Sequence, residues 1–71
     1  MAKDIQTRFG QRVKTLRKKR GWTQSELAEY LGLDRGYISE LERGQRNITL
    51  ATLDVIAKGF GLTPSRMLTG L

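Results

Sequence analysis

The chain has 71 residues, a formal net charge of +6, and neither cysteine nor histidine. A chain of this length forms one small domain with a thin margin of stability and no room for a separate ligand-sensing domain. Without these two residue types it lacks disulfides, the usual zinc ligands and the usual general base. A glycine-rich phosphate loop and paired carboxylates are also missing. We therefore expect no enzyme, no metal or cofactor, and no small-molecule ligand.

Membrane and export signals are absent from the sequence. No apolar stretch approaches the ~20 residues that a membrane-spanning helix requires, and the N-terminus lacks the hydrophobic segment of a signal peptide. The lack of cysteine is compatible with a reducing compartment. We expect a cytoplasmic protein without a membrane partner.

The basic residues concentrate in the first 20 positions, where eight lysines and arginines accompany a single aspartate. Such a surplus favours a polyanionic partner, most often nucleic acid. An alternative stays open, because cations near the C-terminal end of a helix also interact favourably with its dipole and need no partner.

The first predicted helix spans residues 4–20. Asp4 can cap its start, and Gly21 can end it in a left-handed conformation. Gly10 lies inside this segment and should weaken the helix by up to ~1 kcal/mol relative to alanine. Apolar residues recur at steps of four, four and three and form one stripe, which consists of Ile5, Phe9, Val13 and Leu16.

Two shorter helices are predicted over residues 23–31 and 35–43. Thr23 and Glu26 have the spacing of a capping box, and Asp34 is the expected N-cap of the second of these helices. Only three residues, including a glycine, separate the two segments, so they must cross at a steep angle. This pattern is typical of a helix-turn-helix. The inward-facing residues are expected to be Leu27, Ala28, Leu31, Ile38 and Leu41.

A fourth helix is predicted over residues 50–60, capped by Thr49, and a fifth starts at Pro64 with Thr63 as its cap. The inner side of the fourth helix is expected to be lined by Leu50, Leu53, Ile56, Ala57 and Phe60. No segment alternates in the manner of a strand. The predicted fold class is therefore all-α, with residues 1–71 forming one compact bundle of about five short helices.

The stretch TQSELAEYLGLDRGYISELERG, residues 23–44, resembles the helix-turn-helix family of phage repressors and Cro-like proteins. The shared pattern is Thr-Gln-x-x-Leu-Ala, a glycine eight residues after the glutamine, and Ile-Ser-x-x-Glu-x-Gly. Within the family, Leu-Asp-Arg-x-Tyr-Ile-Ser followed by Glu-Arg-Gly-x-Arg-Asn is similar to the controller proteins of restriction–modification systems. The resemblance implies a lambda-repressor-like domain that binds a palindromic operator in double-stranded DNA as a homodimer and regulates transcription.

The resemblance also implies roles for individual residues. Those expected to read bases from the start of the third helix are Arg35, Gly36, Tyr37, Ser39 and Glu40. Arg35 can bond both O6 and N7 of a guanine, whereas Glu40 can accept a bond from a cytosine amino group or orient Arg35. Those expected to contact phosphates are Gln24, Arg43, Gln45, Arg46 and Asn47. A buried salt bridge is implied between Arg17 and Glu42.

Residues 62–71 form a predicted dimerisation segment, because one recognition helix reads too few base pairs for useful specificity and family members commonly dimerise here. Its apolar residues are Leu62, Pro64, Met67, Leu68 and Leu71. The alternative is that this segment only closes the monomer. Trp22 is expected to pack on the helix that follows it.

Three further hypotheses stay open at this stage. The acidic surface formed by Glu26, Glu29 and Tyr30 is a candidate contact for RNA polymerase. An antitoxin-like protein-interaction module that also binds DNA is the alternative function. Binding through the basic first helix alone would ignore the base sequence and would collapse with salt.

Overall fold

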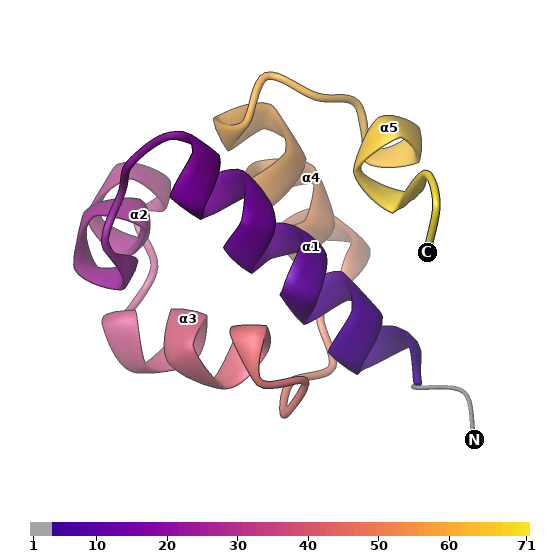
Figure 1. The fold of residues 1–71 in the computed structure, drawn as a ribbon, viewed down its shortest axis with the longest axis horizontal. Helices are drawn as coiled ribbons and strands as arrows, with labels where there is room; N and C mark the ends of the chain where they lie inside the picture. Colours follow the sequence, from indigo (N-terminus) through magenta and orange to yellow (C-terminus); the bar gives the residue numbers. More distant parts are fainter. Residues whose placement is uncertain (1–3) are drawn as a thin grey trace.

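The computed structural model describes residues 4–71 and consists of helices joined by short turns (Figure 1). In chain order they are α1 (Ile5–Lys19), α2 (Gln24–Leu31), α3 (Arg35–Glu42), α4 (Leu50–Gly59) and α5 (Pro64–Leu68). The predicted all-α class is confirmed, and the first four predicted segments match the helices to within one residue at each end. Lys3, part of the basic N-terminal stretch, lies outside the described residues.

The helices begin where the sequence offers a capping side chain. Asp4, Thr23, Asp34, Thr49 and Thr63 each accept a hydrogen bond from a backbone amide in the first turn of the helix that follows. Each bond satisfies an amide that has no partner inside the helix, which explains why these short helices start where they do. The capping box at the start of α2 is present with both of its bonds.

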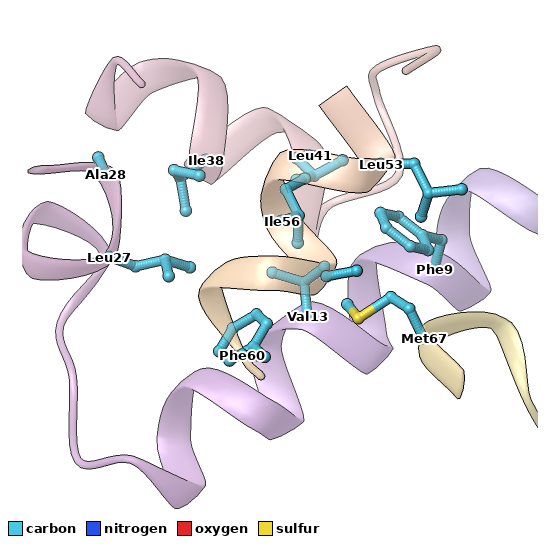
Figure 2. Packing of buried hydrophobic residues seen from close by; sticks show 11 residues of the cluster. Phe9, Val13, Leu27, Ala28, Ile38, Leu41, Leu53, Ile56, Phe60 and Met67 are labelled. Atoms are coloured by element: carbon cyan, nitrogen blue, oxygen red, sulfur yellow. The ribbon is translucent and has the colours of Figure 1, made fainter. Parts of the chain in front are cut away.

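The helices surround one core, to which all five contribute (Figure 2). In Figure 1, α1 runs diagonally across the molecule, with α2 and α3 to one side of it and α5 on the other. Contacts join α2 to α3, α1 to α3, α2 to α4, and α4 to α5. The buried apolar side chains are Phe9, Val13, Leu27, Ala28, Ile38, Leu41, Leu53, Ile56, Ala57, Phe60 and Met67.

Two members of the predicted apolar faces of the first and fourth helices are exposed. Leu50 has 83% of its surface accessible and Ile5 has 56%. Both lie in the first turn of a helix, at the edge of the core. Helical spacing assigns a residue to a face, but it does not say how far along the helix the neighbouring elements extend.

Gly10 has a role that helix propensity does not reveal. The residue is buried, and a Cβ built on it would lie 2.9 Å from the carbonyl oxygen of Glu42 and closer still to that of Leu41. The glycine therefore permits α1 to cross close to the end of α3. Glycine lowers the stability of the isolated helix, but it allows α1 and α3 to approach more closely than any residue with a Cβ would.

Trp22 packs on α2, the helix that follows it, as expected. It also packs on the end of α4. Its ring centroid lies 5.1 Å from that of Tyr30 on α2 and 6.1 Å from that of Phe60 at the end of α4. Arg20 lies over the same tryptophan ring, with its guanidinium carbon 5.4 Å from the ring centroid.

No helix among residues 4–71 is both long enough and apolar enough to cross a membrane.

Candidate nucleic-acid interface

The turn between α2 and α3 fixes the orientation of α3. Gly32 ends α2 with φ of +72°, a conformation that glycine adopts without steric cost. The next amide, that of Leu33, donates back to the carbonyl of Ala28 at 2.8 Å. Ile38 and Leu41 then point into the core, so the opposite side of α3 faces outward (Figure 2). One helix face of this size fits the major groove of DNA.

A buried ion pair ties the end of α3 to α1. Arg17 donates from Nε to Oε2 of Glu42 at 2.7 Å and from Nη2 to Oε1 at 3.0 Å. The two side chains are only 9% and 3% exposed. A third bond runs from Arg17 Nη1 to the carbonyl of Trp22 at 2.8 Å. The hydrogen bond with Glu42 raises the pKa of Arg17 above its already high usual value, so the guanidinium stays charged at any practical pH.

Gln24 belongs to the same network. It opens α2, and its Nε2 donates to Oε1 of Glu42 at 3.1 Å. One of the two side-chain N–H groups of this expected phosphate-binding residue is therefore used by a buried carboxylate, and the second can donate to a phosphate. The backbone amides at the start of α2 still present the positive end of the helix dipole.

The residues expected to read bases lie along the outer side of α3. Arg35 and Gly36 occupy its first turn and are exposed, while Tyr37 and Ser39 are half-buried. Glu40 is half-buried as well, and it pairs with Arg46 rather than with Arg35. No ion pair between Glu40 and Arg35 is present among residues 4–71.

The loop that follows α3 returns along the same face. Both Nε and Nη2 of Arg46 lie 2.8 Å from Oε1 of Glu40. The Arg46 guanidinium carbon also lies 4.9 Å from the centroid of the Tyr37 ring. Asn47 accepts a hydrogen bond from the side chain of Gln6. Arg43 and Gln45 are exposed at the start of this loop.

Three further arginines on or next to α1 donate to backbone carbonyls elsewhere in the fold. Arg20 donates from Nη2 to the carbonyl of Phe60 at 2.8 Å, at the end of α4. Arg12 donates to the carbonyls of Arg66 and Met67 at 3.1 and 3.3 Å, in α5. Arg8 donates to the backbone oxygen of Leu71. Part of the basic surplus is thus used to satisfy carbonyls near the ends of helices.

The apolar C-terminal patch is divided between core and surface. Met67 is fully buried, so it offers no surface to a second copy, contrary to its place in the expected interface. Leu62 and Leu71 are half-buried against the core, and Pro64 is exposed. Leu68 is 39% exposed. It lines an apolar pocket of about 220 Å³ whose other apolar walls are Ile5, Phe9, Ile48 and Leu53.

Comparison with known proteins gives this arrangement a family. Residues 13–67 match the family described as helix-turn-helix. The chain is 41% identical over 69 residues to control protein C.MunI from a Mycoplasma species, which covers 96% of this chain and 93% of that protein. It is 39% identical over 69 residues to control protein C.BamHI from Bacillus amyloliquefaciens, covering 96% and 85%.

Solved structures agree with the sequence relatives. The restriction–modification controller protein C.AhdI from Aeromonas hydrophila has a TM-score of 0.79 and 42% identity, covering 87% of this chain and 92% of that chain. The controller protein C.Esp1396I, solved as a tetramer in complex with its natural 35 base-pair operator, has a TM-score of 0.80 and 34% identity, covering 94% and 92%. The chain therefore belongs to the helix-turn-helix family, together with the restriction–modification controller proteins.

Proposed function

We propose that this protein is a sequence-specific regulator of transcription that binds a palindromic operator in double-stranded DNA as a homodimer, and that it is not an enzyme. The observation that carries the proposal is the outward face of α3, which presents Arg35 in its exposed first turn while Ile38 and Leu41 anchor the helix from behind. Controller proteins with the same fold, one of them solved on its operator, support this function. We propose that it acts in the cytoplasm.

In this proposal the side chains divide into base readers and phosphate ligands. Arg35 bonds a guanine, Gly36 permits close approach of the backbone, and Tyr37 and Ser39 contact neighbouring base edges. Phosphates are held by the first-turn amides of α2 and by the loop residues Arg43, Gln45, Arg46 and Asn47. Gln24 donates to a phosphate with the second N–H of its side-chain amide, whose first N–H is engaged by Glu42.

The dimer is proposed to form on the side of the molecule that carries α5. Leu68 and Ile5 are exposed there and line one apolar pocket. Leu50, in the first turn of α4, is exposed as well and lies close in sequence to Ile48 and Leu53, which also line that pocket. Burying such residues against an identical copy removes apolar surface from water on both sides of a two-fold axis. Pro64 and the half-buried Leu62 and Leu71 would extend this contact.

The test is in vitro selection from a random duplex pool near physiological ionic strength, where purely electrostatic binding is weakened. We expect enrichment of a two-fold symmetric site with half-sites about one helical turn apart. Arg35→Ala should then relax the preference for one guanine and cost about 1–3 kcal/mol at that position. A protein that enriches no sequence would contradict the proposal and would favour the antitoxin-like or non-specific alternatives.

A contact with RNA polymerase is the second part of the proposal. Glu26 and Glu29 are exposed on α2 and line a shallow pocket with Trp22 and Tyr30, so an acidic surface with an aromatic base faces away from the core. Glu29→Lys should leave operator binding intact and abolish any activation in a transcription assay with purified polymerase. Unchanged activation by this variant would remove α2 from consideration as the contact.

A further inference from the structure

Three side chains on the outer side of α3 form one connected cluster. Tyr37 and Glu40 lie one turn apart on the helix, and Arg46 reaches back from the loop to both of them. Tyr37 is half-buried and packs against the core, so its ring is a fixed platform. The side chains of Arg46 and Glu40 are 46% and 41% exposed, so DNA can reach both.

This cluster restrains Arg46 in a defined orientation. Glu40 takes the edge of the guanidinium that is formed by Nε and Nη2, while the guanidinium carbon lies over the ring of Tyr37. Nη1 and Nη2 each direct one further N–H to the opposite, end-on edge, which this arrangement does not require. With that edge a guanidinium can bond an acceptor pair. An acceptor placed there by a correctly docked duplex would meet Arg46 without displacing it.

We infer that Glu40 is a specificity-determining residue that acts through Arg46 rather than by touching a base. The inference rests on the proposed function. On DNA of arbitrary sequence, binding comes almost entirely from phosphates, and these do not lie at one fixed place relative to Arg46. Arg46 must then leave Glu40 to reach a phosphate, and the carboxylate is left facing a polyanion. On the operator, where α3 docks in one register, Arg46 can bind from its restrained position.

Glu40 therefore penalises binding to arbitrary DNA more than binding to the operator. Glu40→Ala should raise the affinity for a scrambled duplex about three- to tenfold and steepen its salt dependence by about one phosphate contact. The affinity for the selected duplex should change less or fall, because Arg46 loses its preset orientation. The ratio of the two affinities should drop at least about threefold.

The experiment measures binding of the full chain to the duplex enriched by selection and to a scrambled duplex of equal length, across a salt series. Four proteins are compared with wild type: Glu40→Ala, Arg46→Ala, the double variant, and Asp54→Ala. Asp54 is the matched control, since it is an exposed carboxylate paired with Lys58 at 3.0 Å on α4, and its removal changes the net charge equally.

The expected result is that Glu40→Ala lowers the affinity ratio when Arg46 is present and leaves it unchanged when Arg46 is alanine. An equal loss in both backgrounds would overturn the inference, because Glu40 would then read a base directly. An effect no larger than that of Asp54→Ala would also overturn the inference, because it would show that Glu40 acts only through its contribution to the net charge. Failure of the proposed function is a separate outcome, in which wild type itself does not distinguish the two duplexes.

Discussion

Replacing Glu42 by alanine should destabilise the fold severely. The substitution leaves the guanidinium of Arg17, only 9% exposed, with the carbonyl of Trp22 as its remaining partner in this network. It also removes the acceptor of the Gln24 amide. Removing one member of a buried ion pair costs about 3–5 kcal/mol, since the other charge stays buried without compensation.

That cost is large relative to the stability of such a small domain. At about 0.05–0.15 kcal/mol per residue, a chain of 71 residues is stable by roughly 4–11 kcal/mol. Each kcal/mol shifts the melting temperature of a domain this size by about 4–8 °C, so we expect a drop of at least about 12 °C. If the wild-type stability lies at the lower end of the roughly 4–11 kcal/mol range, much of the variant population would be unfolded.

The assay is thermal and urea unfolding, followed by Trp22 fluorescence and by the helical circular dichroism. One fixed protein concentration is used, because the proposed dimerisation would stabilise the fold. Glu40→Ala is the control, since it breaks an exposed pair and should cost less than about 1 kcal/mol. The double variant Arg17→Met/Glu42→Leu removes both charges and should recover most of the loss. A Glu42→Ala variant with an unchanged unfolding midpoint would refute the reasoning.

Three other predictions concern single residues. Gly10→Ala should lower the free energy of unfolding by about 1–3 kcal/mol in denaturant titrations, although alanine has the better helix propensity. The reason is that its Cβ would press on the carbonyls of Leu41 and Glu42. A gain in stability would contradict the close crossing of the two helices. The backbone hydrogen bond from Thr7 holds the pKa of Asp4 below its ordinary value, so this cap stabilises above the unfolded pKa and the effect is lost as pH falls through the folded pKa. The melting temperatures of wild type and Asp4→Ala should therefore differ near about pH 6 and converge by about pH 2, and a constant gap would exclude this origin. Leu50→Ser should leave the monomer's stability within about 0.5 kcal/mol and weaken the dimer in light scattering, whereas an intact dimer would move the interface elsewhere.

The helix starts could be predicted because their signals are local. A capping side chain acts on amides two or three residues away, so Thr23 and Asp34 carry their effect in the sequence itself. The helix-turn-helix followed from the same kind of information, namely a glycine between two short amphipathic segments. The exposure of Leu50 could not be predicted, because it depends on where the neighbouring helices end.

The side-chain partners on the outer surface were beyond the reach of the sequence for a related reason. Arg46 and Glu40 meet only after the loop has folded back along α3, and Gln24 meets Glu42 only after α2 and α3 have packed. Each of these side chains has several acceptable partners, and spacing alone does not select among them. The role of Gly10 is of the same type, since its neighbour comes from another helix.

The arginines of α1 differ in the kind of atom that they bond. Arg12 and Arg20 donate to backbone carbonyls, whereas Arg17 donates to the carboxylate of Glu42 as well as to one backbone carbonyl. A backbone carbonyl is present whatever side chain the accepting residue carries, but a carboxylate is lost with the residue that supplies it. Among related sequences, positions 17 and 42 should therefore change together or not at all. Arginine at positions 12 and 20 should persist while the residues that accept its bonds vary freely.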